Sequence, residues 1–295
     1  MEILFNRFFL NHNINSEAEG AYRIEEFPSY FDDTEADGED FITLIHPVHY
    51  KDRIKRACKN QRVLAEILLT PESYKAACLS VGLAVKAAEQ NDFAIIRPPG
   101  HHADREKASG FCLFNNVAIA AQKLVNEGKK VFIFDFDGHH GDGTQSLFYD
   151  SDRVFYCSIH QMFTWPFTGQ PTETGTGAGK GYTFNLPLLS GCGDKEFLER
   201  VDKAIDAAHR FKPDVIAMSA GFDGYEKDRL LNLNFTLKGF YECGYRWRRA
   251  FSNIFAVLEG GYHQDIKTCV QYFVDGVNVG SRPPRKSFDE MMSLG

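Results

Sequence analysis

Residues 131–142 read VFIFDFDGHHGD, an apolar run that passes directly into a turn rich in acid, histidine and glycine. The apolar half predicts a buried strand over 131–136, and the polar half predicts the loop after it. In such a strand Asp135 and Asp137 share one face, and His139 lies just beyond in the turn. Carboxylates and an imidazole at this spacing form part of a zinc or other divalent-metal site. A polar loop that merely caps a sheet is the alternative, which we disfavour because it leaves buried charges without partners.

The sequence on both sides of this stretch alternates between apolar strands and amphipathic helices. We expect strands over 93–96, 131–136, 154–159, 182–186, 215–219 and 254–258. We expect helices over 72–90, 115–127, 194–211, 236–251 and 263–277. Such alternation predicts a three-layer α/β fold, a parallel sheet with helices on both faces. We expect one domain over 1–280, an exposed acidic loop over 32–40, and a flexible tail over 281–295.

Composition and charge restrict the class of protein. The chain has 295 residues, 43% of them hydrophobic, which is enough for one large core. Its net charge of −7 argues against a broad surface that binds nucleic acid. Its seven cysteines include no CxxC pair, which is typical of reduced thiols in a cytosol-like compartment. We find neither a signal peptide nor an apolar stretch of membrane length. We therefore expect a soluble cytoplasmic protein without a membrane partner. We leave its oligomeric state open.

A chemically active side chain follows each of five predicted strands, and glycine lies close to it at four of them. In chain order these are His101 with His102, the cluster of 135–142, His160, Asp223, and Tyr262. Ligands bind outside the carboxyl ends of the strands in open parallel sheets, and those ends meet at one edge. Each motif alone has a plain structural interpretation as a turn or a surface pair. Their agreement across five strands predicts a single catalytic site at that edge.

The residue types at this edge suggest a metal and an acid–base pair. Asp137, His139 and Asp223 provide three metal ligands with an open position, as in catalytic zinc sites. His101 and His102 suit general base and acid work because imidazole titrates near neutral pH. The set predicts metal-assisted hydrolysis of an amide or a related carbonyl.

Two carboxylates and a phenol complete the predicted site. Asp135 and Asp142 are free to accept the outer N–H of the two histidines and so fix their orientation. Tyr262 follows two glycines, where its phenol can face a developing oxyanion. We interpret the histidines without this context as structural or surface residues: His12, His46, His49 and His209.

Six segments in this order resemble one known family. They are RPPGHHA (97–103), SGFCLFNN (109–116), DFDGHHGDGT (135–144), SIHQ (158–161), SAGFD (219–223) and LEGGY (258–262). Together they resemble the zinc-dependent histone deacetylases and their bacterial relatives, the acetylpolyamine amidohydrolases. RPPGHHA and LEGGY are similar to the class II and bacterial branch. The resemblance covers about 75–280.

The resemblance implies the arginase/deacetylase fold and a role for each motif residue. The implied zinc ligands, for one ion per chain, are Asp137, His139 and Asp223. It implies that His102, paired with Asp142, is the principal general base and acid, and that His101 beside it pairs with Asp135. It also implies that Tyr262 hydrogen-bonds the substrate carbonyl and then the tetrahedral oxyanion.

The resemblance further implies cation and substrate sites. A structural monovalent cation, usually potassium, would be bound by groups of Asp135, Asp137, His139, Ser158 and Ile159. A second, outer cation is expected near Phe148, Ser151, Val154 and Tyr182. The walls of an acyl-lysine tunnel are expected to be Gly110, Phe111, Trp165 and Leu230.

Four features depart from the family pattern. Gly138 replaces the apolar residue usual between the zinc Asp and His, which loosens that turn or makes room beside the metal. The segment 160–169 differs from the usual aromatic-Pro-Gly-Thr-Gly loop at the tunnel rim. An acidic residue that grips the substrate backbone is not obvious in the N-terminal third, where Glu66 is the nearest candidate. Leu230 stands where some polyamine-selective members carry a glutamate, which disfavours that selectivity.

The sequence therefore predicts a zinc-dependent amidohydrolase that removes acetyl or other acyl groups from acyl-lysine side chains in proteins. Deacetylation of small acetylated polyamines or other small acyl amines by the same residues is the alternative. A ureohydrolase with two manganese ions would need more carboxylates around the metals. A catalytically silent acyl-lysine reader would not need the intact His, Asp and Tyr set. We expect no direct nucleic-acid partner.

Overall fold

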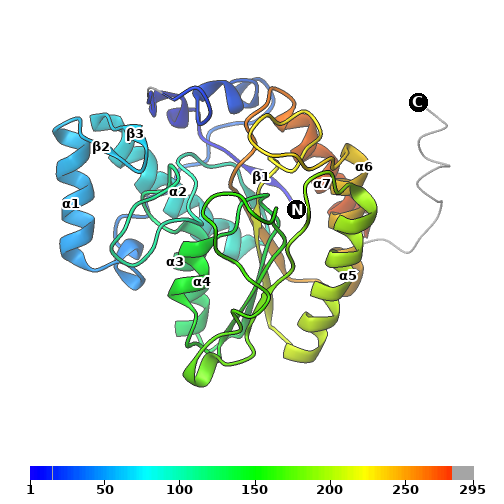
Figure 1. Ribbon diagram of the computed structural model, residues 1–295. Helices are drawn as coiled ribbons and strands as arrows, with labels where there is room; N and C mark the ends of the chain where they lie inside the picture. Colours follow the sequence, from blue (N-terminus) through cyan, green and yellow to red (C-terminus); the bar gives the residue numbers. More distant parts are fainter. Residues whose placement is uncertain (15, 281–295) are drawn as a thin grey trace.

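The computed structural model describes residues 1–14 and 16–280, and its centre is a seven-stranded sheet (Figure 1). All paired neighbours in this sheet are parallel, in the order β1-β4-β9-β8-β5-β6-β7. The strands are β1 (Ile3–Leu4), β4 (Phe93–Ala94), β5 (Val131–Asp135), β6 (Val154–Ser158), β7 (Thr183–Asn185), β8 (Val215–Ala220) and β9 (Ile254–Leu258). A separate antiparallel hairpin consists of β2 (Val63–Leu64) and β3 (Ile67–Leu68).

Helices cover both faces of the sheet. One face carries α2 (Pro71–Gln90) and α3 (Asn116–Asn126), with α1 (Val48–Lys59) outside them, and the other carries α5 (Asp194–Phe211), α6 (Leu237–Ala250) and α7 (Ile266–Gly280) (Figure 1). A short helix, α4 (Asp142–Leu147), follows the polar turn after β5. Within the residues described, no helix combines the length and apolar character that a membrane span requires. The predicted three-layer α/β fold is confirmed.

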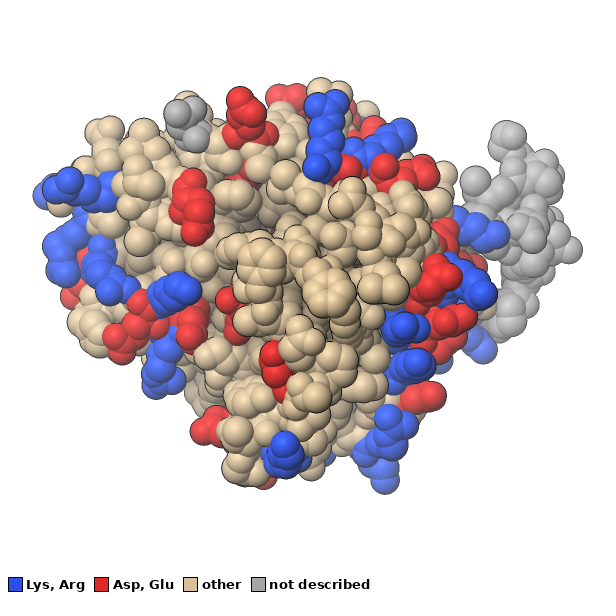
Figure 2. Space-filling view, in the orientation of Figure 1, with Lys and Arg blue, Asp and Glu red and all other residues tan. Residues whose placement is uncertain are grey.

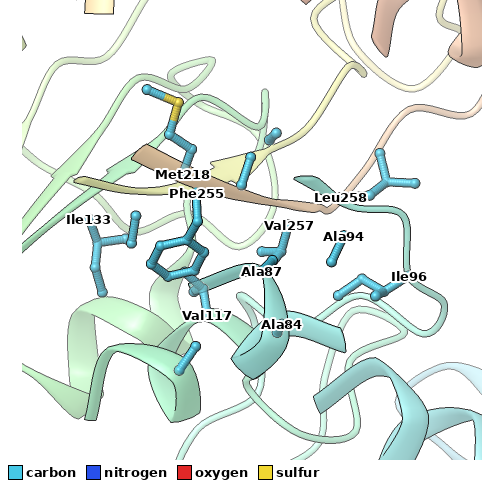
Figure 3. Close-up of a cluster of buried hydrophobic side chains, with 14 of the residues drawn as sticks. Ala84, Ala87, Ala94, Ile96, Val117, Ile133, Met218, Phe255, Val257 and Leu258 are labelled. Atoms are coloured by element: carbon cyan, nitrogen blue, oxygen red, sulfur yellow. The ribbon is translucent and has the colours of Figure 1, made fainter. Parts of the chain in front are cut away.

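Helix α2 shows why the sequence folds this way locally. Thr70 and Ser73 form a capping box at its start, and Asn91 in the left-handed conformation ends it. Its buried face is rich in alanine, so the helix approaches the sheet closely. Figure 3 shows Ala84 and Ala87 of this helix near Phe255 and Val257 of β9.

Several element boundaries differ from the sequence predictions. The expected strand over 131–136 ends one residue earlier, at Asp135, although the Phe136 N–H still donates to Ser219 O of the neighbouring strand β8. The expected strand over 93–96 is confined to Phe93–Ala94, and the helix expected over 263–277 is Ile266–Gly280. The expected tail over 281–295 lies outside the described residues. Helix α1 and the β2–β3 hairpin were not predicted.

Candidate active site

The site lies where the carboxyl ends of β5, β8 and β9 meet. In the parallel register Asp135 pairs with Ser219, and Ser219 pairs with Val257. The three loops that follow therefore leave the sheet side by side and carry their polar side chains to one place. Parallel pairing thus converts widely separated sequence motifs into one cluster.

Asp137, His139 and Asp223 form the metal-competent group of this cluster. One ligand atom from each residue lies within 4.8 Å of the others. His139 Nδ1 is 2.6 Å from Asp223 Oδ2 and 3.4 Å from Asp137 Oδ1. Burial would lower the pKa of His139, but the carboxylates of Asp223 and Asp137 outweigh it and raise the pKa to about 10. Two buried carboxylates and an imidazole make a site that favours a cation, and the donor set fits zinc.

Close backbone approach fixes the position of Asp137. The Gly260 N–H donates to Asp137 Oδ2 at 2.7 Å. A Cβ at Gly260 would lie 2.5 Å from the same oxygen, and one at Gly221 would lie 2.0 Å from it. Only glycine fits these two positions without moving the carboxylate.

Gly138 makes room for a neighbouring leucine. A Cβ at this position would lie 2.2 Å from Leu231 Cδ1 and 3.1 Å from Asp223 Oδ1. The Gly138 N–H also donates to Asp223 Oδ1 at 2.6 Å, which ties the turn to the third candidate ligand. The space expected beside the metal is therefore filled, since the buried Leu231 side chain occupies it.

The tandem histidines each face a carboxylate. His102 Nδ1 lies 2.8 Å from Asp142 Oδ1, and His101 Nδ1 lies 3.1 Å from Asp135 Oδ2. Burial and the neighbouring His101 lower the pKa of His102 well below 6.5. Burial also acts to lower the pKa of His101, but Asp137 and Asp135 outweigh it and raise that pKa well above 6.5. The adjacent imidazoles are therefore pushed toward opposite protonation states.

Tyr262 is held from the N-terminal part of the chain. The Arg23 guanidinium lies 5.0 Å from the centre of its ring, and Arg23 Nε donates to Gly261 O at 2.6 Å. Burial and the negative charge of Asp137 raise the pKa of Tyr262 well above 10. The phenol therefore keeps its proton and remains a hydrogen-bond donor.

The residues expected to wall a tunnel surround His102 and Tyr262. Trp165 packs edge-on against His102 with ring centroids 4.5 Å apart, and Phe111 does so against Tyr262 at 5.9 Å. A Cβ at Gly110 would lie 2.5 Å from both His102 and Trp165, so only glycine lets the backbone approach the two rings this closely. Leu230 borders a cavity of about 960 Å³ that Tyr262 also lines.

Glu66 lies at the tip of the β2–β3 hairpin, where its side chain is exposed. Its carboxylate accepts a hydrogen bond from the Gly110 N–H at 2.7 Å. Ala65 O accepts another from the Phe111 N–H at 3.0 Å. The hairpin thus supports one wall of the site.

The residues expected around cations lie behind the cluster. Asp135 pairs with Ser158 in the β5–β6 register, and the Ile159 N–H donates to Asp135 O at 2.9 Å. Ser158 Oγ lies 2.9 Å from His160 Nδ1. The residues expected at the outer cation site lie on neighbouring segments between α4 and β7: Phe148, Ser151, Val154 and Tyr182.

His140 forms hydrogen bonds outside the metal-competent group. Its Nδ1 lies 2.8 Å from Thr168 Oγ1, and its Nε2 lies 3.0 Å from Gln145 Oε1. Of the four histidines interpreted as structural or surface residues, two are fully buried, His12 and His46. The other two are His49, which is 68% exposed, and His209, which stacks on Phe251.

Sequence reasoning missed the supports of this site. Glu259 lies in the LEGGY motif, and its buried carboxylate accepts hydrogen bonds from the N–H groups of Gly100 and His101 at 2.7 and 3.2 Å. Its other oxygen accepts from Ser219 Oγ at 3.0 Å. The position of Glu259 at a strand end was the available signal, because a buried carboxylate there needs donors.

A buried ion cluster ties the N-terminal segment to the site. The Glu19 carboxylate contacts Arg23 at 3.0 Å and Arg97 at 2.9 Å, and all three side chains are fully buried. Arg23 also donates to Glu259 O. Glu19 and Arg23 are four residues apart, but their partners Arg97 and Glu259 are far away in the sequence, so no local pattern signals the whole cluster.

A parallel sheet with an Asp/His/Asp ligand set at its carboxyl edge defines a protein of the arginase/deacetylase fold. The histone deacetylase domain model matches residues 13–277. The chain therefore belongs to the histone deacetylase family. The HD domain of HDA15 superposes with a TM-score of 0.87 at 28% identity, over 99% of this chain and 92% of that one.

Curated relatives carry both names that the resemblance suggested. A probable deacetylase from Archaeoglobus fulgidus is 44% identical over 203 residues, 63% of this chain and 56% of that protein. Histone deacetylase 5 from Arabidopsis thaliana is 36% identical over 85% of this chain and 42% of its own length. An acetylpolyamine amidohydrolase from Burkholderia pseudomallei is 40% identical over 63% of this chain and 55% of that protein. The chain thus spans about half the length, or less, of these relatives.

Proposed function

We propose that this chain is a zinc-dependent deacylase that hydrolyses the amide of acyl-lysine side chains in proteins. The observation that carries the proposal is the His102–Asp142 pair beside the Asp137, His139 and Asp223 group. An imidazole with a lowered pKa is neutral and ready to accept a proton, and its carboxylate partner fixes which nitrogen does so. Membership of the histone deacetylase family supports the same chemistry.

The roles of the side chains follow from their contacts. Asp137, His139 and Asp223 would hold one zinc ion per chain, which when bound supplies Lewis-acid activation of water and of the acyl oxygen. His102 Nε2 takes the proton of the attacking water, because its Nδ1 faces Asp142. The same nitrogen returns the proton to the departing amine.

His101 and Tyr262 both stabilise negative charge in the site. His101 carries positive charge next to Asp135 and Asp137, and we assign it the task of balancing the negative charge of the site. Tyr262 keeps its phenolic proton and donates it as a hydrogen bond to the acyl oxygen as negative charge develops there. Its neighbour Phe111 would contact the apolar stem of the acyl chain.

The surroundings of the site favour an acyl-lysine in a protein over a polyamine. Trp165 and Leu230 are 37% and 47% exposed, and the exposed Phe163 and Phe167 flank Trp165 in the same loop. Figure 2 shows a face with a broad uncharged area at its centre and acidic side chains close to it. These exposed apolar side chains offer contacts to the stem of an acyl-lysine and to the protein surface around it. The acetylpolyamine amidohydrolase among the relatives favours the alternative.

Further assignments complete the proposal. Residues 1–280 would form one catalytic domain of a cytoplasmic protein that acts on an acylated protein or small acyl amine. A structural potassium ion would be bound by groups of Asp135, Asp137, His139, Ser158 and Ile159. Glu66 would orient the substrate indirectly, by holding Gly110 in the wall of the site.

Parallel assays on an acetyl-lysine peptide and on acetylspermidine test the proposal and its alternative. We expect one zinc per chain, faster turnover of the peptide, and inhibition by a hydroxamate. Tyr262→Phe should lower kcat by about 10² or more, as loss of an oxyanion donor does. Near-normal turnover by Tyr262→Phe would contradict the assignment. Two metals per chain would point to a ureohydrolase, and binding without turnover to a silent reader.

A further inference from the structure

Asp228 links the two loops that carry the oxyanion donor and the rim of the site. It lies in the loop after β8, five residues beyond Asp223, and only 9% of it is exposed. Its Oδ2 accepts a hydrogen bond from the Tyr262 N–H at 2.6 Å. Its Oδ1 accepts another from the Leu230 N–H at 2.8 Å. One carboxylate therefore joins the loop after β8 to the loop after β9.

The Asp228 carboxylate interacts mainly with these two backbone N–H groups. Among the residues that the structure describes, no Lys or Arg side chain forms an ion pair with Asp228. A carboxylate that accepts two backbone N–H groups makes charge-assisted bonds, which are about twice as strong as neutral ones. Both of its oxygens are engaged, so an amide at this position could serve only one of the two donors.

The peptide unit between Gly261 and Tyr262 is held at both ends by opposite charges. Its carbonyl oxygen accepts from the Arg23 guanidinium at 2.6 Å, and its N–H donates to Asp228 at 2.6 Å. Gly261 has φ +117°, a conformation that glycine adopts freely and that leaves the backbone open to rotation. Gly260 precedes it, so neither residue before Tyr262 has a Cβ that restricts its backbone. Because these two bonds hold the peptide unit in place, they also fix the position of the Tyr262 Cα and the direction of its side chain.

We propose that Asp228 is a positioning residue that holds the Tyr262 phenol at the reacting carbonyl. This inference rests on the proposed function, because it assigns Asp228 to the step in which Tyr262 stabilises the oxyanion. The bond to Leu230 sets the distance between the rim loop and the same tyrosine. A shift of about 1 Å in a catalytic group costs on the order of 10² in rate, so a backbone anchor has a large effect on catalysis.

The test compares Asp228→Asn and Asp228→Ala with the wild type and with Tyr262→Phe. We expect kcat to fall roughly tenfold for Asp228→Asn and roughly 100-fold for Asp228→Ala, with KM and bound zinc little changed. The matched control is Asp265→Asn, which removes a carboxylate near the same loop that contacts Lys227 instead of the Tyr262 backbone. Its kcat should remain within about twofold of the wild type.

A double-variant cycle separates positioning from general destabilisation. If Asp228 acts through Tyr262, Asp228→Ala should lower kcat less than about threefold in the Tyr262→Phe background. Full additivity of the two losses, or a kcat for Asp228→Asn equal to that of the wild type, would overturn the inference. If Asp228→Ala does not fold, the kcat of Asp228→Asn alone tests the inference, because this variant keeps one hydrogen-bond acceptor. Failure of the wild type to hydrolyse any acyl amine would instead overturn the proposed function.

Discussion

Gly138→Ala tests whether the metal-competent turn and Leu231 are fitted to each other. The added Cβ would lie 2.2 Å from Leu231 Cδ1, whereas carbon atoms in contact are about 3.5–4.0 Å apart. The leucine or the turn must therefore move by roughly 1.5 Å. The Leu231 side chain is buried, so it has little free space to enter.

The effect of Gly138→Ala on stability and activity depends on which residues move to accommodate the added methyl group. Overpacking a buried position costs about 1–3 kcal/mol of unfolding free energy. The turn also carries the Gly138 N–H bond to Asp223 and lies between Asp137 and His139. A displacement of 1 Å or more in these ligands should lower kcat/KM by about 10². We therefore expect a modest loss of stability with a large loss of activity and of zinc affinity.

The assay is a double-variant cycle with Leu231→Ala. Leu231→Ala alone removes a buried side chain and should cost about 2–3 kcal/mol of stability. In Gly138→Ala/Leu231→Ala the new methyl group enters the space that the leucine leaves. We expect the double variant to recover at least tenfold in kcat/KM over Gly138→Ala, with a coupling energy of about 1–3 kcal/mol in thermal or urea unfolding. Wild-type activity in Gly138→Ala, or strictly additive losses in the double variant, would refute the reasoning.

Three further outcomes are expected. Chelation of the bound metal should abolish hydrolysis and lower the melting temperature, because the folded state then loses the free energy of metal binding. Added zinc should restore both, and activity that survives complete metal removal would contradict this expectation. Burial lowers the pKa of His46 from 6.5 to about 4, so its contribution to stability is complete above pH 6.5 and is lost as the pH falls toward 4. In His46→Gln, the loss of unfolding free energy between pH 7 and pH 5 should shrink by about 2 kcal/mol, measured by urea unfolding at both pH values. Glu19→Ala leaves two buried guanidinium groups without their carboxylate and should cost about 3–5 kcal/mol, whereas a loss below 1 kcal/mol would show that the cluster is not stabilising.

The parts of the site that the sequence predicted are attached to periodic elements. Asp137 and His139 follow an apolar run whose burial can be read from composition, and Asp223 follows another. Because strands of a parallel sheet end at one edge, strand assignment alone brings such residues together. The sequence could thus predict which side chains meet without any knowledge of distances.

The supports of the site could not be predicted in this way. Glu19 and Arg97 are 78 residues apart, and Arg23 contacts a tyrosine far along the chain. In the described residues before α1, the regular structure is short 3-10 segments and the two-residue strand β1, which are too short to show the period of a helix or strand. Gly138 illustrates a second limit, because its partner Leu231 is visible only once the loops are packed.

The N-terminal segment connects stability to catalysis. Its share of the central sheet is the two-residue strand β1, yet Arg23 from this segment anchors the carbonyls of Glu259 and Gly261. Glu19 holds Arg23 in place and also binds Arg97 at the end of β4. The same ion cluster therefore contributes to folding and fixes the backbone before Tyr262. A weakened cluster should displace the phenol before the sheet unfolds, because the Gly261 carbonyl next to Tyr262 then loses its bond to Arg23.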